Sequence, residues 1–328
     1  MIPMVLIGST DQELSHAPLI FVAGPTAIGK TDLALTLADE FACEIIGVDS
    51  MQIYQYMDIG TAKPSKDERS RVPHHLIDYV LPDEAFSASR FVVDCQEAIR
   101  QIRAKGRQPM LVGGTGLYFN ALENGIFEMP ATDQQIRKDL HEELKSSGRE
   151  VLFRELKERD PESGIRIHPN DTYRLIRALE IVRSTSQTWS SFIAEHREQK
   201  KCKPKHNIIK IGLSRDRDEL YERIRLRVKN MISGGLLAEV ENLMGMGYSQ
   251  DLSPMQSLGY RHMLHYLRGD WTWAQTLELL TRDTRRYAKR QFTWFKADTE
   301  ILWYHPKQTA EICATIAEFL ETATPKSS

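Results

Sequence analysis

The 328-residue sequence contains only four cysteines, at positions 43, 95, 202 and 313. None of them lies at a CxxC spacing or in a Cys/His cluster, so neither a disulfide framework nor a zinc site is expected. The sequence also lacks an apolar run of about 18 residues, the length that a membrane-spanning helix needs. Its first 16 residues lack the basic start of a signal peptide. We therefore expect reduced thiols, no membrane partner and a cytoplasmic protein.

The sequence also has no large excess of one charge, because its 43 Lys and Arg residues nearly balance its 45 Asp and Glu residues, for a formal net charge of −2. This balance argues against a general basic coat for nucleic acid, although a local basic face remains compatible with it. The hydrophobic fraction of 41% is typical of a globular protein, and the length suits one large domain or two ordinary ones.

The stretch GPTAIGKT, residues 24–31, fits the phosphate-binding pattern G-x-x-x-x-G-K-[ST]. It follows the apolar segment LIFVA (19–23) and precedes TDLALTLADEF, whose apolar residues recur at helical spacing. Strand, loop and helix in this order begin a P-loop α/β sheet. Lys30 is expected to neutralise phosphate charge, and the Thr31 hydroxyl to bind Mg²⁺. The predicted phosphate-binding residues are Gly24, Pro25, Thr26, Ala27, Ile28, Gly29, Lys30 and Thr31.

Two further loops are predicted at the same edge of this sheet. The segment CEIIGV (43–48) is typical of a buried strand and is followed by Asp49, and QPMLV (108–112) is typical of another, followed by GGTG. In open α/β sheets the ligand lies beyond the carboxyl ends of the strands. We therefore expect a P-loop NTPase-like parallel sheet in which the P-loop, Asp49 and GGTG surround one crevice, with a later strand at 208–213.

The pattern becomes helical after residue 125, where apolar residues recur at helical spacing from 131 to 192. In HPND, Asp171 is expected to be the N-cap of the following helix. The lysine-rich stretch REQKKCKPKH (197–206) is interpreted as a linker. We predict a discontinuous P-loop core, 1–124 and 203–328, with a helical insertion domain at 125–202. Helices are also expected at 216–245 and 254–297.

Asp49 has two interpretations. An Asp at the end of an apolar strand is typical of the carboxylate that holds Mg²⁺ in NTPases. It is also suited to act as a general base in the predicted crevice. The residues alone leave both roles open.

Seven motifs occur in order along most of the chain: GPTAIGKT, VDSMQIY, DIGTAKP, VPHHLID, LVGGTGLY, RIHPNDTYRLIRALE and YAKRQFTWF. Together, from about residue 20 to about residue 304, they resemble the bacterial tRNA dimethylallyltransferases, the tRNA isopentenyltransferases of the MiaA type. The resemblance implies that the P-loop grips the diphosphate of dimethylallyl diphosphate. It implies transfer of the five-carbon group to N6 of the adenosine 3′-adjacent to the anticodon in tRNA, with release of diphosphate.

The resemblance also implies roles for individual residues. Asp49 becomes the general base that removes a proton from the attacking amine, and Thr115 of GGTG helps to orient that amine. Lys30, Arg227 and Mg²⁺ stabilise the charge that develops on the departing diphosphate. Without the resemblance, Arg227 would be interpreted as a solvated residue of a mixed-charge helix.

The segment 281–296 carries six basic residues and one acid, interleaved with aromatic residues. This mixture suits RNA, yet it is equally typical of the solvated face of an amphipathic helix. The resemblance assigns this segment, the insertion domain at 125–202 and several other segments to the binding of tRNA at its anticodon stem-loop. The implied tRNA-binding residues are Asp49, Ser50, Met51, Gln52, Thr115, Arg137, Tyr173, Arg174, Arg177, Gln256, Gly259, Tyr260, Arg261, Lys289 and Arg290.

Three other functions are weighed against this one. A prenyltransferase acting on free adenine nucleotides (an adenylate isopentenyltransferase) would not need the insertion. A small-molecule kinase or ATPase would use the same P-loop and would release phosphate from ATP. A non-catalytic RNA-binding protein would not need to retain Lys30, Thr31, Asp49 and Thr115. The expected partners are thus tRNA and dimethylallyl diphosphate, bound by a monomer.

Overall fold

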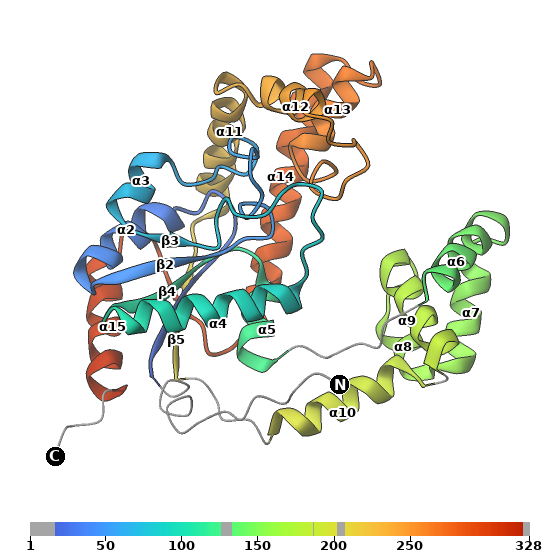
Figure 1. The fold of residues 1–328 in the computed structure, drawn as a ribbon, viewed down its shortest axis with the longest axis horizontal. Coiled ribbons are helices and arrows are strands. Elements are labelled where there is room, and N and C mark those ends of the chain that lie inside the picture. The colour runs from blue at the N-terminus through green and yellow to red at the C-terminus, as the bar shows by residue number, and fades with distance from the viewer. Residues whose placement is uncertain (1–16, 126–132, 186, 202–206, 324–328) are drawn as a thin grey trace. The chain divides into compact units, whose positions relative to one another are not determined.

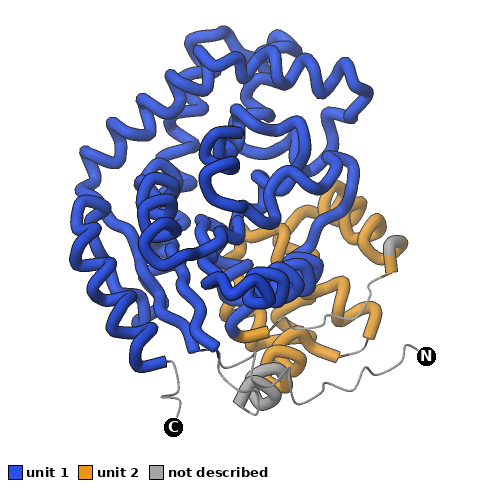
Figure 2. Tube along the Cα trace, turned by 60° about the vertical axis from the view of Figure 1, so that its left-hand side comes forward, with its two compact units in different colours: residues 1–123, 205–328 blue, residues 124–204 orange. Residues whose placement is uncertain are grey.

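The computed structural model describes residues 17–125, 133–185, 187–201 and 207–323. They form two compact units, unit 1 from residues 1–123 and 205–328 and unit 2 from residues 124–204 (Figure 2). The start of the chain (1–16), Cys202 and the PKSS tail lie outside the described residues. The predicted linker is helical as far as Lys201, and its remainder also lies outside them.

Unit 1 is built on a six-stranded sheet with the order β3-β2-β4-β1-β5-β6, in which all neighbouring strands are parallel. The strands are β1 (Leu19–Ala23), β2 (Cys43–Val48), β3 (His74–His75), β4 (Gln108–Gly113), β5 (Ile208–Leu213) and β6 (Leu302–Tyr304). The four longer strands and the parallel α/β architecture confirm the prediction. The two edge strands were not predicted, because two or three residues are too few to show a hydrophobic period.

Unit 1 has helices that flank this sheet and others that lie above it in the view of Figure 1. They are α2 (Lys30–Glu40), α3 (Lys66–Arg71), α4 (Ala88–Ala104), α5 (Gly116–Asn124), α11 (Arg217–Ser233), α12 (Leu236–Gly245), α13 (Tyr260–Leu267), α14 (Trp273–Lys296) and α15 (Thr309–Ala323). The helix predicted over 216–245 is interrupted at Gly235, whose φ of 98° favours glycine. The helix predicted over 254–297 is two helices, and it starts only at Tyr260.

Alternating side chains along β1 build two hydrophobic cores, one on each face of the sheet. Ile20 and Val22 pack with residues of α2 and α15, whereas Leu19 and Phe21 pack with residues of α4, α5 and the end of α14. A third core joins α11–α14 to the loops after β2. Because helices cover both faces, the strands are apolar throughout, which is why the sequence predicts them well.

Unit 2 is helical and has its own core, which includes Leu140, Leu152 and Leu175. Its helices are α6 (Gln134–Ser146), α7 (Arg149–Arg159), α8 (Pro161–Arg166), α9 (Thr172–Thr185) and α10 (Trp189–Lys201). As predicted, Asp171 caps α9, since its Oδ1 accepts the Arg174 N–H at 3.1 Å. The long helical stretch expected from the sequence is thus several short helices, which fold back on one another to bury a shared core.

Candidate active site

The P-loop connects β1 to α2 at the carboxyl end of the sheet. Gly29, just before α2, has a φ of 106°, which a residue with a side chain rarely adopts. Lys30 begins the helix, and its Nζ donates to the carbonyl oxygens of Gly24 at 2.9 Å and Pro25 at 2.8 Å. The ammonium group therefore lies against the loop, at the helix N-terminus that favours an anion.

The GGTG loop lies directly beside the end of β2. The N–H groups of Gly114 and Thr115 both donate to the carbonyl oxygen of Val48. A Cβ at Gly113 would lie 2.0 Å from this oxygen, so the close approach of the two loops requires glycine there. Thr115 Oγ1 then accepts the Ser50 N–H at 3.1 Å. The structure thus brings Thr115 next to the segment that begins at Asp49.

The carboxylate of Asp49 is oriented by its own loop. Its Oδ1 accepts the N–H groups of Met51 at 2.8 Å and Gln52 at 3.3 Å. Burial lowers the pKa of both Lys30 and Arg227, and the Asp49 carboxylate opposes this lowering at each of them. These three predicted residues therefore share one electrostatic environment.

Lys30 and Arg227 are both positioned to meet a negatively charged ligand. Burial lowers the pKa of Lys30 to about 7; Asp49 opposes this effect and Arg227 adds to it. Burial likewise lowers the pKa of Arg227, whose Nη2 donates to the Thr61 carbonyl at 3.2 Å. The desolvation of two cations in one site would be relieved by a bound anion.

Two further arginines reach the P-loop, and the sequence analysis missed both. Arg215 Nε donates to the Ile28 carbonyl at 2.8 Å, and Arg223 Nε donates to the Ala27 carbonyl at the same distance. Arg223 lies in the same ERIRLR stretch as Arg227, one helical turn earlier on α11. That spacing was the available signal, since residues four apart lie on one face of a helix.

Gln291 of α14 was missed as well, although it lies within the YAKRQFTWF motif. Its side chain is buried, with Oε1 accepting the Thr26 N–H at 2.8 Å and Nε2 donating to the Gly114 carbonyl at 2.9 Å. It therefore contacts both the P-loop and the GGTG loop.

Glu239 of α12 fixes the DIGTAKP loop. Its carboxylate accepts three consecutive backbone N–H groups, those of residues 58–60, at 2.7–3.0 Å. It also accepts the hydroxyl of Tyr260 at 2.6 Å. Tyr260, predicted to contact tRNA, is therefore a fully buried side chain whose hydroxyl is already used within the protein. The structure thus shows Tyr260 supporting the carboxylate that holds this loop, and a contact with tRNA stays a prediction.

The other predicted residues around Tyr260 are placed differently. Gln256 is exposed, and Arg261 is partly exposed while its Nη2 contacts Asp283 of α14 at 3.2 Å. Gln52 donates from Nε2 to the carbonyls of Thr61 and Ala62. Gln52 therefore steadies the loop whose Thr61 carbonyl holds Arg227.

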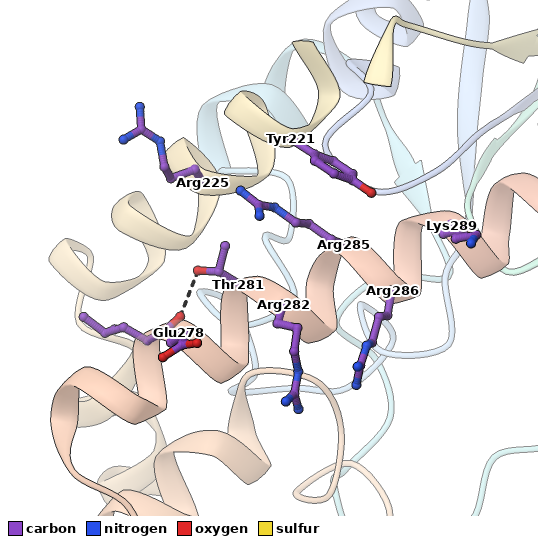
Figure 3. A pocket seen from close by; sticks show the side chains of 9 residues that line it. Tyr221, Arg225, Glu278, Thr281, Arg282, Arg285, Arg286 and Lys289 are labelled. Atoms are coloured by element: carbon purple, nitrogen blue, oxygen red, sulfur yellow. Dashed lines mark hydrogen bonds between the residues drawn. The ribbon is translucent and has the colours of Figure 1, made fainter. Parts of the chain in front are cut away.

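A basic groove lies between α11 and α14, with a volume of about 620 Å³ (Figure 3). It is lined by Tyr221, Arg225, Leu277, Glu278, Thr281, Arg282, Arg285, Arg286 and Lys289. The Arg285 guanidinium lies 4.8 Å from the centroid of the Tyr221 ring. Of the residues predicted from the sequence, only Lys289 lines the groove, while Arg290 is exposed on the same helix.

Unit 2 carries the remaining predicted residues. Arg137 and Arg177 both bind the buried carboxylate of Glu180, at 2.7 Å and 2.9 Å, and Arg174 pairs with Asp171. Tyr173 is 73% exposed. The two arginines that share Glu180 thus form one cluster.

Within the described ranges, no group of three or more His, Cys, Asp or Glu residues could hold a metal ion. A P-loop magnesium ion does not need such a group, because phosphate and water oxygens supply most of its ligands. Thr31, exposed in the first turn of α2, fits the role of the single hydroxyl ligand. None of the described helices is long and apolar enough to cross a membrane.

Comparison with known proteins relates this architecture to one family. The profile described as IPP transferase matches residues 52–298. The chain is 48% identical to tRNA dimethylallyltransferase 2 of Geotalea uraniireducens, over 92% of this chain and 96% of that protein. It is 46% identical to the tRNA dimethylallyltransferase of Desulfotalea psychrophila, over 93% and 96% of the two chains.

Solved structures agree with the sequence comparison. The tRNA isopentenylpyrophosphate transferase of Bacillus halodurans matches 94% of this chain and 98% of its own, with a TM-score of 0.69 and 38% identity. A eukaryotic dimethylallyltransferase acting on tRNA matches 95% of this chain and 81% of its own, with a TM-score of 0.74 and 27% identity. With a matching profile over most of its length and relatives aligned nearly end to end, this chain belongs to the IPP transferase family.

Proposed function

We propose that this protein transfers the dimethylallyl group of dimethylallyl diphosphate to N6 of the adenosine 3′-adjacent to the anticodon in tRNA and releases diphosphate. The observation that carries the proposal is the near-full-length similarity to proteins named tRNA dimethylallyltransferase. The geometry supports it, because a phosphate-binding loop after β1 and an oriented carboxylate after β2 lie at the same edge of one sheet, on either side of the GGTG loop after β4. A tRNA substrate implies that the protein acts in the cytoplasm, and we propose that it does so as a monomer.

On the donor side, the allylic C–O bond breaks and its electrons leave with the diphosphate. Lys30 and Arg227 lie where they can stabilise this charge, together with the N–H groups of the P-loop. Arg215 and Arg223 hold the loop through the Ile28 and Ala27 carbonyls. Stabilisation that grows as the charge develops favours the transition state over the bound donor.

On the acceptor side, the N6 lone pair attacks the carbon that the diphosphate leaves. This amine is a weak nucleophile because its lone pair is delocalised into the ring, so it must lose a proton during attack. Asp49 is the base that we assign to that proton, since its carboxylate is fixed by two backbone N–H groups. Thr115, which holds the Ser50 N–H, orients the amine beside it.

Magnesium fits this site with Thr31 as its protein ligand. When bound, it would supply additional positive charge to the oxygens of the leaving diphosphate. Thr31 is exposed at the start of α2, next to Lys30.

We assign tRNA binding to several exposed surfaces of the two units. In unit 1 these are the loop at 50–52, the segment around Gln256 and Arg261, and the basic face of α14 with Lys289 and Arg290. The groove adds Arg285 and Arg286 to this face. In unit 2 they are Arg137 and the α9 surface with Tyr173, Arg174 and Arg177. Arginine binds RNA phosphates, and an exposed tyrosine can stack on an unpaired base.

The experiment incubates the protein with unmodified tRNA, dimethylallyl diphosphate and Mg²⁺, and analyses the nucleosides by mass. We expect N6-isopentenyl-adenosine at one position of the tRNA. Prenylation of AMP in place of tRNA would overturn the proposed substrate. Steady phosphate release from ATP, with no change in the tRNA, would favour a P-loop kinase or ATPase.

A further inference from the structure

We propose that Gln291 is a positioning residue that connects the donor loop to the acceptor loop of the active site. Its Oε1 accepts the N–H of Thr26 in the P-loop, and its Nε2 donates to the carbonyl of Gly114, just before Thr115. Both bonds join residues far apart in sequence, by 265 and 177 positions. This inference rests on the proposed function, because it concerns how the two substrates are aligned.

The site is built to admit this side chain. A Cβ at residue 114 would lie 2.3 Å from Gln291 Nε2, so only glycine leaves room for the amide. Gln291 is 7% exposed. A buried amide that donates and accepts one bond each, at 2.9 Å and 2.8 Å, has a fixed orientation.

The contacts continue beyond Gln291 to the candidate base. Gly114 is followed by Thr115, whose hydroxyl accepts the Ser50 N–H, and Ser50 follows Asp49 in the chain. Gln291 thus connects the loop that grips the leaving group to the segment that holds the amine and its base. In a displacement the attacking nitrogen, the carbon and the leaving oxygen must be aligned, and an error of about 1 Å can cost roughly 10²-fold in rate.

Two substitutions at this position separate the two hydrogen bonds. Gln291→Met keeps the length of the side chain and removes both bonds. Gln291→Glu keeps an acceptor for the Thr26 N–H, but its ionised carboxylate cannot donate to the Gly114 carbonyl. Gln101→Met is the matched control, because Gln101 is exposed on α4 and its Nε2 donates to Glu97 of the same helix.

The measurements are the single-turnover transfer rate with both substrates saturating, donor affinity, tRNA affinity and the thermal unfolding midpoint. For Gln291→Met we expect a folded protein whose rate falls about 10-fold to 10²-fold, with both affinities within about five-fold of wild type. For Gln291→Glu the rate, relative to wild type at each pH, should rise as the pH is lowered from about 8 to about 6, because a protonated carboxyl can again donate. Gln291→Met should show no such rise.

Several outcomes would overturn the proposal. A folded Gln291→Met protein with a transfer rate within two-fold of wild type would show that the connection does not matter. A loss confined to donor affinity would mean that Gln291 stiffens the P-loop alone, and a parallel loss of tRNA affinity would make it an RNA contact. If one variant fails to fold, the other still decides the matter through the same rate. An inactive wild-type protein would instead count against the proposed function, and a loss of rate in Gln101→Met equal to that in Gln291→Met would overturn the specific role of Gln291.

Discussion

Unit 1 holds Arg223 and Arg227 through backbone carbonyl oxygens, whereas unit 2 holds Arg137 and Arg177 through one buried carboxylate, that of Glu180. Within the described residues, neither Arg223 nor Arg227 forms an ion pair with a carboxylate. A carbonyl oxygen fixes a guanidinium without neutralising it, whereas a carboxylate does both. Arg223 and Arg227 thus retain a full charge for an anionic ligand, unlike Arg215, which also pairs with Glu219.

This difference separates two uses of positive charge. The positive charge of Arg227 is desolvated, and it becomes favourable only when an anionic ligand binds beside it. In unit 2, the same kind of residue first satisfies a buried acid and so contributes to the packing of its helices. Chemical steps should therefore depend on the arginines of unit 1 and far less on those of unit 2.

The largest effect is expected from Asp49→Asn, which keeps the size of the side chain and removes the proton acceptor. If Asp49 is the general base, the single-turnover rate should fall by roughly 10²-fold or more while both substrates still bind. The assay is run over a Mg²⁺ series, with donor affinity measured in parallel. Substantial rescue by raised Mg²⁺ would instead make Asp49 a metal ligand.

A direct comparison of the two units replaces one arginine in each. Arg223→Met should weaken donor binding about 10-fold or more, the scale of a hydrogen bond that involves a charged group, with little change in tRNA affinity. Arg174→Met in unit 2 should leave donor affinity unchanged. Titrating both variants with dimethylallyl diphosphate measures their donor affinities. Equal losses of donor affinity would contradict the proposed difference between the arginines of the two units.

The charge of the donor site should also depend on pH. Since the pKa of Lys30 in the free protein is about 7, a bound diphosphate that raises this pKa must draw in a proton above pH 7. Donor affinity should therefore fall as pH rises above 7, by at most about tenfold per unit. Calorimetry in buffers of different ionisation enthalpy should detect the proton uptake, and Lys30→Met should abolish it.

The same lowered pKa has the opposite effect on folding. Above pH 7 the unfolded chain binds more protons at Lys30 than the folded protein does, so the contribution of Lys30 to the free energy of unfolding increases with pH. If donor affinity and the free energy of unfolding both fall as the pH rises, the cause would therefore be general unfolding and not the titration of Lys30.

The smallest effect is expected in unit 2, from the combined replacement of Arg137, Arg174 and Arg177 by Gln. Because these arginines already pair with Glu180 and Asp171, tRNA affinity should fall only a few-fold. The slope of log affinity against log salt should become less steep, but by less than the loss of three phosphate contacts would cause. An unchanged slope would mean that the three residues serve unit 2 alone.

The sequence predicts those parts of the site that depend on local pattern. Lys30, Asp49 and Thr115 each follow an apolar strand, and the parallel sheet brings such strand ends to one edge. Gln291 and Glu239 could not be predicted in this way, since their partners lie far away in the sequence and are chosen by the packing of α12 and α14. Tyr260 shows the converse, because a residue within a predicted RNA-binding motif is buried and holds Glu239 instead.

The division of unit 1 into two chain segments also affects how the protein folds during its synthesis. When residues 17–123 have left the ribosome, β1 can pair with β4. The other edge of β1 stays unpaired until β5 is synthesised, which happens only after unit 2. Unit 2, residues 124–204, takes about 4–16 s to translate at typical rates. An unpaired apolar strand edge can pair with other chains. During this interval the unpaired edge of β1 can therefore pair wrongly with strands of other chains. Unit 2, with its own hydrophobic core, can already fold at that stage.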